Sequence, residues 1–467
     1  MFLLLAILYA YQGNAQATPL HFPYQDLTLG ASPLPLPSCK DTRSLWDIIW
    51  SCLVTSFACS WVSVHPNIPA PGEGRVMKGL RKFELMLWSI LSPELIIMWA
   101  VRQWLGARRL EAKYSDRGWT KTHGYFIQMG GFRLYEGDIS LGILSAERFG
   151  TLLEKGRINM PTITEAEIQD RSKGDGLAKA LVIVQTTWFI TQCIARRASG
   201  LVLTQLELIT LALAALNSIM YFFWWNKPLD VQSTVPVYLL ETSTNRSPSD
   251  SLTTENDESA SEGESSNLFC LKTLLALYSA AEEVYISPEW RAFTKIVDYW
   301  PLLPITKVLT RMEHMAQLRS DPKVDGLERV PTFYALPIPV IGSYDWMNVM
   351  VVAGVSVVGS LFGAVHCVGW SFFFPTDGEA TTWRVLSIIV AGAPLAGIWA
   401  LLPHFAYRIP ESPRLRNIFS DNYVFFMFIP PYVLARIGLL VEAFILLRDL
   451  PDGANDVVTW TTFIPHV

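Results

Sequence analysis

The sequence predicts an all-α, polytopic helical membrane protein with about seven transmembrane helices. Several separated apolar runs each approach the roughly 20 residues that a helix needs to cross the hydrocarbon core of a bilayer. The clearest run, residues 349–374, contains no Asp, Glu, Lys or Arg. Of the 467 residues, 51% are hydrophobic and 17% are charged. This composition is typical of spans joined by soluble loops, and a net charge of −5 gives no indication of nucleic-acid binding.

The first 17 residues are predicted to be a secretory signal peptide. Their apolar run of about ten residues is too short to span a bilayer. It leads to Ala15-Gln16-Ala17, which fits the small-residue pattern of a cleavage site. No basic residue precedes the run, so an uncleaved anchor is the alternative. Residues 18–44 are rich in Pro, Leu and Ser without a helical period, and we expect an extended segment.

Residues 45–101 are predicted to form transmembrane helices 1 and 2. The first span, 45–64, ends where Pro66, Pro69 and Pro71 forbid further helix. The second span, 83–101, contains Pro93. Residues 102–175 mix both signs of charge with aromatic residues, so we expect a soluble or interfacial loop region.

The second half of the chain is predicted to hold a helical hairpin, a disordered loop and three more spans. The hairpin, within residues 176–226, pairs helices 177–195 and 201–225 across a very short turn. The acidic, Ser/Thr-rich stretch 241–267 has too few apolar side chains to offset its ordering entropy and is predicted to be disordered. The remaining predictions are interfacial helices and a loop over 268–347, spans at 349–374, 385–402 and 423–447 within 348–449, and a tail over 450–467.

The orientation depends on the signal peptide. If it is cleaved, residues 18–44 are lumenal, and the basic loop 65–82 and the Arg196-Arg197 turn are cytosolic, as the positive-inside rule favours. The disordered loop is then lumenal, and Asn245 in Asn245-Arg246-Ser247 becomes a glycosylation site. The predicted location is a membrane of the secretory system, either the endoplasmic reticulum or the plasma membrane. The basic residues that follow span two favour the inverted orientation, which stays open.

Cysteine spacing and motif searches identify neither a cofactor nor a metal site. The six cysteines form no C-x-x-C pair, so a structural zinc site is not expected. Cys39 and Cys270 lie outside the spans and would form a disulfide only if both faced an oxidising lumen. No P-loop, dinucleotide fingerprint, zinc-protease motif or nucleophile elbow is present. No repeat of 20–50 residues and no inverted duplication of the hydropathy pattern is visible.

Several stretches resemble a widespread family of fungal multipass membrane proteins without an assigned activity. The stretches are Trp61 with His65-Pro66-Asn67-Ile68-Pro69-Ala70-Pro71, Trp119-Thr120-Lys121-Thr122-His123-Gly124, Met129-Gly130-Gly131-Phe132, Tyr221 with Trp224-Trp225-Asn226-Lys227-Pro228-Leu229-Asp230, Phe362-Gly363 with His366-Cys367 and Trp370-Ser371-Phe372, and Tyr432-Val433-Leu434-Ala435-Arg436 with Glu442. They cover nearly the whole chain apart from the disordered loop. The resemblance implies a fungal origin and membrane residence, and it carries over no catalytic role.

Four ionisable residues at membrane depth are the candidate catalytic residues, because each is costly there unless it is paired or faces water. Glu94 follows Pro93, whose missing N–H bends the helix and frees a carbonyl. His366 is a candidate proton donor or metal ligand in an otherwise uncharged span. Each has an ordinary structural reading as well, namely a carboxylate bonded to the helix break and a histidine bonded to a neighbouring helix.

The other two candidates, Arg436 and Glu442, share span seven. Six residues correspond to about 240° around a helix, so the two side chains do not meet on one face. Arg436 with Glu94 and Glu442 with His366 are candidate pairs, and a structural ion pair that locks the bundle is the ordinary reading. We predict that the four residues converge on one polar cluster, with Glu442 at its margin.

The leading functional hypothesis is a membrane-embedded enzyme that acts on a lipophilic substrate in secondary metabolism. Proton-initiated cyclisation or isomerisation of an isoprenoid would need a buried acid, a base and an aromatic cavity. The alternatives are a small-molecule transporter or exporter, which should show several polar helices around one cavity, and a scaffold or receptor without chemistry. The expected partners are the lipid bilayer and a lipophilic small molecule.

Overall fold

A computed structural model describes residues 42–172, 175–240, 311, 315, 324–337, 346–399 and 421–459. The predictions of a signal peptide, of an extended segment up to residue 41 and of a disordered loop at 241–267 lie outside these residues. So do most of the region 268–347, the glycosylation site Asn245, and Cys39 and Cys270.

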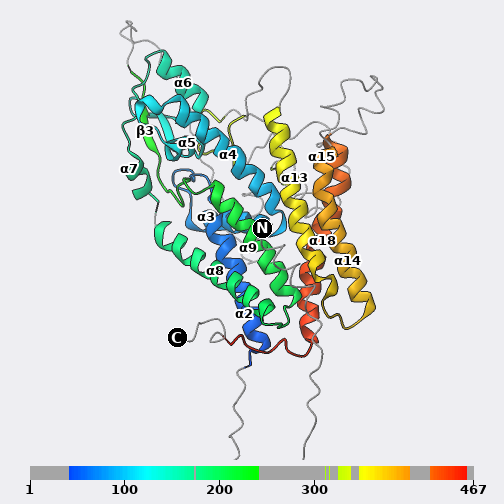
Figure 1. Cartoon of the computed structure of the whole chain (residues 1–467). Helices are drawn as coiled ribbons and strands as arrows, with labels where there is room; N and C mark the ends of the chain where they lie inside the picture. Colours follow the sequence, from blue (N-terminus) through cyan, green and yellow to red (C-terminus); the bar gives the residue numbers. More distant parts are fainter. Residues whose placement is uncertain are drawn as a thin grey trace, which may run out of the picture.

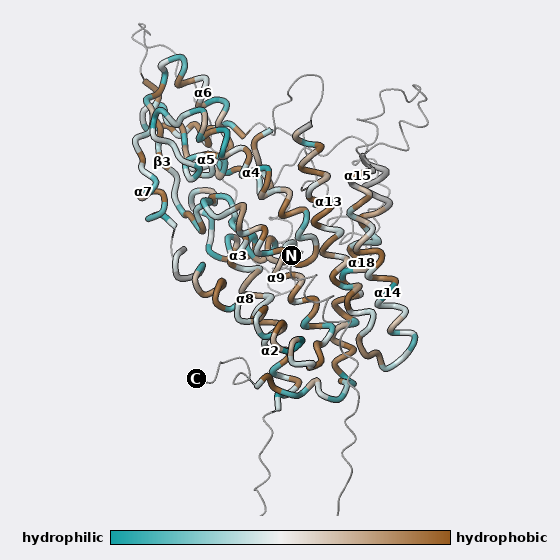
Figure 2. The backbone as a smooth tube through the Cα atoms, viewed as in Figure 1, coloured by the Kyte–Doolittle hydropathy of each residue, from teal (hydrophilic) through white to brown (hydrophobic). Residues whose placement is uncertain are grey.

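Four helices in the described residues are long and apolar enough to cross a membrane, whereas about seven were predicted. They are α2 (Leu45–Ser63), α9 (Gln205–Phe223), α13 (Trp346–Cys367) continued by the 3₁₀ turn η2 (Val368–Ser371), and α18 (Asp421–Ile445) continued by η4 (Leu446–Arg448). The helices of the bundle are mainly hydrophobic along their length (Figure 2). A membrane protein is therefore the class that fits the structure.

The predicted second span is broken in the structure. It forms α3 (Arg75–Leu91) and α4 (Pro93–Lys113), which are bent by 113° and count as a fifth span only if the pair is taken as one. Proline disfavours a helical residue before it, and Ser92 lies outside the helical region with φ −144° and ψ 63°. The same proline suits the first position of the next helix, where no N–H is needed. Because the bend exceeds 90°, α4 runs back towards the side from which α3 came.

Two further helices lie alongside the spans without meeting the same criterion of length and apolarity. Helix α8 (Asp175–Ala198) packs on α2 and exposes Leu181, Val184 and Trp188, at helical spacing on one face. Helix α14 (Asp377–Gly392) packs on α13 and α18, and is followed by η3 (Ala393–Leu395) and α15 (Ala396–Trp399). The predicted spans 177–195 and 385–402 are therefore not shown to be transmembrane.

A small β-sheet corrects the prediction of an all-α fold. Strands β1 (Phe132–Glu136) and β2 (Ile139–Ile143) are antiparallel, and β3 (Val235–Tyr238) lies parallel to β1 from about 100 residues away, giving the order β2-β1-β3. The sheet and the short helices beside it form one end of the molecule (Figure 1). These helices are η1 (Ser115–Arg117), α5 (Lys121–Gln128), α6 (Ala146–Glu154) and α7 (Glu165–Asp170).

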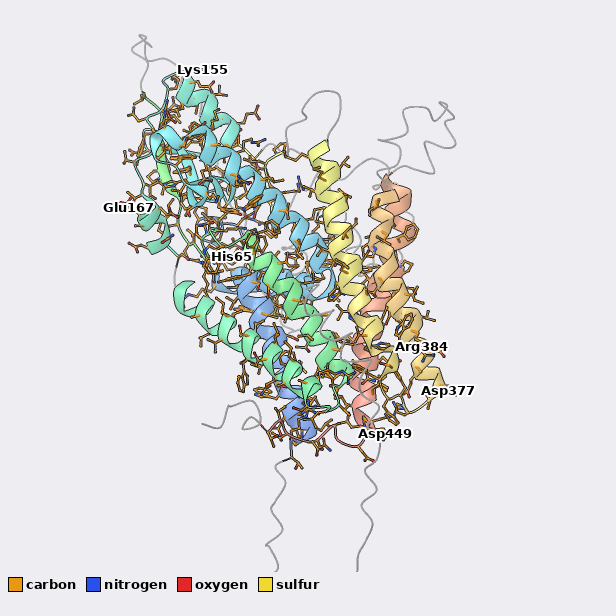
Figure 3. All side chains as sticks on the ribbon, viewed as in Figure 1. His65, Lys155, Glu167, Asp377, Arg384 and Asp449 are labelled. Carbon is orange, nitrogen blue, oxygen red and sulfur yellow. The ribbon has the colours of Figure 1, made fainter. Side chains whose placement is uncertain are left out.

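The opposite end, here called the Arg43 end, is held by contacts between distant segments. Arg43 forms a salt bridge with Glu207 at the start of α9, and Arg196 at the end of α8 donates to the Asp456 carbonyl at 2.7 Å. Figure 3 shows Lys155 and Glu167 at the sheet end, and Asp377, Arg384 and Asp449 at the other end. The loop 65–82 joins the sheet end through Lys82 and Asp230. The structure places this loop and the Arg196-Arg197 turn at opposite ends of the bundle, whereas their side of the membrane stays a prediction.

Candidate functional site

Arg436, near the middle of α18, is the centre of a polar cluster inside the bundle. Its Nη1 donates to the Tyr432 hydroxyl at 3.0 Å, one turn earlier on the same helix. Its Nη2 donates to the Ile90 carbonyl at 2.6 Å, which lies in the last turn of α3. The guanidinium also lies 4.3 Å from the centroid of the Phe362 ring on α13, a cation–π distance. Three helices therefore fix the orientation of this one side chain.

Glu94 lies beside Arg436, as the sequence analysis suggested for this pair. Glu94 Oε2 is 3.9 Å from Arg436 Nη1, and both side chains are only 9% exposed. This separation is a salt bridge but not a hydrogen bond, and Oε2 has no hydrogen-bond partner among the residues that the structure describes. The break between α3 and α4 explains why Arg436 contacts both the Ile90 carbonyl and Glu94. The break leaves the Ile90 carbonyl without a partner within the helix and places Glu94 in the first turn of α4.

His366 reaches the same cluster from α13. Its Nδ1 lies 3.1 Å from the Phe362 carbonyl and 3.2 Å from the Gly363 carbonyl, so Nδ1 carries the proton. Its ring contacts the Phe362 ring edge to face, with centroids 5.0 Å apart. Phe362 thus lies against both His366 and Arg436. A neutral imidazole with a protonated Nδ1 has a lone pair on Nε2 that can accept a hydrogen bond.

Arg436 and His366 line a pocket of about 150 Å³. Aliphatic side chains supply most of its other walls, and Arg436 carries the only permanent charge among the lining residues. The lining residues are Cys52, Leu53, Ser56, Ile90, Leu91, Leu206, Ile209, Thr210, Leu213, His366, Arg436, Leu439, Leu440 and Phe444. They come from α2, α3, α9, α13 and α18, so the pocket is mainly apolar, with Arg436, His366 and the hydroxyl residues Ser56 and Thr210 as its polar lining.

Glu442 does not join this cluster. It is 6% exposed and is not among the residues that line the pocket. The groups that act on its carboxylate belong to α14, namely Glu379 and the Trp383 backbone. Three of the four predicted residues therefore gather around Arg436 and Phe362, and the fourth faces a second helix, as its angular offset from Arg436 requires.

Close packing of α13 against α14 supports the His366 side of the pocket. A Cβ atom added at Gly363 would clash with the backbone of Ala391, and one at Gly359 would lie 3.0 Å from Pro394 Cβ. The two glycines are four residues apart, the spacing that lets membrane helices approach closely. The Trp383 indole of α14 donates to the His366 carbonyl at 3.0 Å, so the two helices are also joined at this residue.

A second buried cation, Lys227, lies just beyond the end of α9 and was not among the predicted site residues. Its side chain is completely buried. Its Nζ donates to the His65 carbonyl and, at 2.9 Å, to Gln103 Oε1. It lies 4.5 Å from the Trp99 ring and 4.6 Å from the Trp224 ring. Burial without a carboxylate partner among the described residues lowers the pKa of Lys227 well below its usual value.

The Lys227 contacts join parts of the chain that are far apart in sequence. His65 follows α2, Gln103 belongs to α4 and Trp224 ends α9, so one ammonium group holds three segments. Gln103 Oε1 also accepts from Trp224 Nε1 at 3.0 Å, while Gln103 Nε2 donates to the Tyr334 carbonyl at 2.8 Å. Lys227 is not among the residues that line the Arg436 pocket. Its contacts join three segments of the fold.

Sequence reasoning missed three contributors to the Arg436 site. Tyr432 and Phe362 read as ordinary apolar residues of their spans, although Tyr432 stands at the i, i−4 position to Arg436, where helical neighbours meet. That spacing is the signal that could have found it. For the Ile90 carbonyl the only signal in the sequence was Pro93. A proline that breaks a helix leaves a carbonyl of the preceding turn without its partner within the helix.

Comparison with known proteins gives a family but no activity. The sequence profile of DUF8562, described as a family of unknown function, matches residues 36–249 and 328–467. No curated protein matches the chain significantly. No solved structure does either. Since the profile covers well over half of the sequence, including the segments that carry both buried cations, the chain belongs to the DUF8562 family.

Proposed function

We propose that this protein is a membrane-embedded enzyme that moves a proton on a lipophilic substrate bound in the Arg436 pocket. The observation that carries the proposal is that Arg436 and His366 line one mainly apolar pocket between helices apolar enough to cross a membrane. Arg436 and His366 are the catalytic residues in this proposal. Glu94 and Tyr432 are positioning residues, because they act through Arg436.

The contacts of the two catalytic side chains suit an isomerisation. Arg436 is a donor only and is already oriented by Tyr432 and the Ile90 carbonyl, so it can hold a substrate carbonyl oxygen without rearranging. The C–H bond next to that carbonyl breaks, its proton passes to His366 Nε2, and the electron pair forms an enolate stabilised by Arg436. Return of the same proton to another carbon of the conjugated system gives an isomer, so no co-reactant is needed.

The pocket dimensions favour this chemistry over cyclisation of an isoprenoid. An engineered apolar cavity of about 150 Å³ holds one benzene molecule, which is far smaller than a folded isoprenoid chain. Phe444 is the only aromatic lining residue, whereas a cyclising carbocation needs several aromatic faces. The substrate that fits is lipophilic, with a compact oxygenated group at the reacting end. The fungal setting and a role in secondary metabolism belong to this proposal.

A transporter is the second candidate, and the bend between α3 and α4 is the observation that favours it. Broken helices that end inside the membrane beside a charged residue are typical of transporter binding sites. In this chain the break lies beside Arg436, through the Ile90 carbonyl and Glu94. An enzyme produces a new isomer, whereas a transporter redistributes an unchanged compound, so product analysis separates the two.

The test is expression of the full-length chain in a heterologous host, followed by profiling of the lipophilic metabolites of cells and medium. We expect a new compound isomeric with a host or supplied lipophile, and its loss in His366→Ala. Cys367→Ala is the matched control, because this neighbouring residue does not line the pocket. A profile identical to that of the empty host would overturn the enzymatic proposal. An unchanged compound that moves between cells and medium would favour transport.

A further inference from the structure

We infer that the ligand of the Arg436 pocket enters sideways from the bilayer core between α2 and α18, and that it is a neutral lipophile with one small oxygen-bearing head group. The head occupies the pocket and the hydrocarbon tail stays among the lipids. This inference rests on the proposed function for the place of binding, and it adds the route and the chemical class of the ligand.

The route follows from which lining residues are exposed. Leu53 of α2 is 45% exposed and Phe444 of α18 is 38% exposed, while Cys52 and Leu439 on the same helices are buried. Both helices pack on α9, so the pocket lies between them with α9 as its floor. Exposed Leu and Phe on two candidate spans face hydrocarbon in a membrane. The mouth of the pocket therefore opens towards lipid chains.

The depth of the pocket beside Arg436 disfavours charged ligands. Leu53 is the ninth residue of the 19-residue span Leu45–Ser63, and Arg436 is the ninth of the 21-residue span Phe428–Arg448. Both positions are near the middle of the bilayer. A charged side chain at this depth costs about 2.5–3.5 kcal/mol on insertion scales. An ionised fatty acid or a phospholipid head group would have to leave the interface at a similar cost, whereas a ketone or an alcohol would not.

The charges around the pocket also favour a neutral ligand with one oxygen-bearing group. Glu94 balances Arg436 at 3.9 Å, so the pair has no net charge to attract an anion. Arg436 offers donors and His366 Nε2 offers an acceptor. A carbonyl accepts from Arg436, and a hydroxyl can also donate to His366. A hydroxyl therefore satisfies both residues and a carbonyl satisfies Arg436, whereas a plain hydrocarbon satisfies neither.

The size of the pocket leaves the tail outside. A volume of about 150 Å³ accepts a head no larger than one ring, as in the benzene-sized cavity cited above. A ligand long enough to be lipophilic therefore has to extend through the mouth past Leu53 and Phe444.

The experiment uses full-length protein in lipid nanodiscs and four photoreactive probes with the same sixteen-carbon, diazirine-bearing chain. The probes end in a methyl ketone, a primary alcohol, a carboxylate or a methyl group. Labelled peptides are identified by mass spectrometry. We expect the ketone or the alcohol to label peptides of α2 and α18 at least tenfold more than the carboxylate and the alkane, and the preferred one of the two identifies the head group.

Variants test the route and the head-group contact separately. Leu53→Trp fills the mouth and should reduce labelling by the neutral probes at least tenfold. Leu434→Trp is the matched control, because Leu434 is 68% exposed on α18 and does not line the pocket. The double variant Arg436→Met with Glu94→Gln removes the donor at position 436 without leaving a lone carboxylate. It should lower ketone and alcohol labelling to the alkane level.

The possible outcomes separate this inference from the proposed function. Carboxylate labelling equal to or above that of the ketone and the alcohol would overturn the neutral class while leaving the pocket as a binding site. Equal labelling in Leu53→Trp and Leu434→Trp would overturn the lateral route. No labelling of pocket peptides by any probe would overturn both the inference and the proposed site.

Discussion

Two of the cations inside this protein, Lys227 and Arg436, have similar surroundings and different roles. Each lies against aromatic rings and donates to a backbone carbonyl of another segment. Lys227 is completely buried and does not line the Arg436 pocket, whereas Arg436 has a carboxylate at 3.9 Å and lines that pocket. A buried charge alone therefore does not identify a functional site. The open space next to the charge does.

The largest effect is expected at Lys227. Lys227→Met removes the donor that joins His65 to Gln103 and should lower the free energy of unfolding by about 3–5 kcal/mol. About 1–3 kcal/mol comes from buried acceptors left without a donor, and about 2 kcal/mol from the lost cation–π contacts. Thermal unfolding of the full-length protein in nanodiscs measures it. The control is Lys179→Met, whose ammonium lies 5.9 Å from Trp225 near the surface and which should cost less than about 1 kcal/mol. Equal losses in both variants would contradict the enclosed role of Lys227.

The packing beside His366 gives the next effect. Gly363→Ala places a methyl group against the Ala391 backbone and should cost about 1–3 kcal/mol by overpacking. Gly354→Ala on the same helix is the control, because an added Cβ there meets no atom within 4 Å. The same unfolding assay compares the two. If Gly363→Ala is as stable as Gly354→Ala, α13 and α14 are not held as closely as the pocket requires.

The pH dependence of the free energy of unfolding tests the burial of Lys227. The pKa of Lys227 is lowered in the folded protein by burial, so between that pKa and the unfolded value of about 10.4 the unfolded chain binds the extra proton. Stability should therefore rise with pH up to about 10, by about 1.4 kcal/mol for each unit of lowering. The contribution is complete above the unfolded pKa and is lost as pH falls through the folded pKa. Melting curves from pH 6 to 10 should show this rise in the wild type and a weaker one in Lys227→Met, and identical slopes would speak against it.

The smallest change in stability is expected at the pocket, where the effect on activity is large. The hydrogen bonds of the His366 ring among the described residues go to carbonyls of its own helix, so His366→Asn should alter stability by less than about 1 kcal/mol. Product formation should fall by about 10²–10⁴-fold if Nε2 transfers the proton. Metabolite profiling and unfolding are measured on the same preparation. If product formation and the free energy of unfolding fall together, His366 has a structural role like that of Lys227.

Length and apolarity were enough to find four of the predicted spans, and the rest depended on contacts between distant segments. The α2 and α18 predictions hold within a few residues, because continuous apolar runs report directly on helices at membrane depth. The sheet was missed because β3 pairs with a strand about 100 residues earlier. Arg436 and Glu94 were paired in advance because membrane depth leaves few partners. Lys227 was passed over because it follows a span and reads as a residue of the interface.

The 113° bend between α3 and α4 decides how the two ends of the bundle are connected. Leu240 lies at the sheet end, since its N–H donates to the Arg157 carbonyl, and Lys82 pairs with Asp230 at the same end. Arg43 lies at the opposite end, where it pairs with Glu207. Because α4 returns towards the side from which α3 came, Arg43 and Leu240 would face opposite sides of a bilayer that α2 and α9 cross.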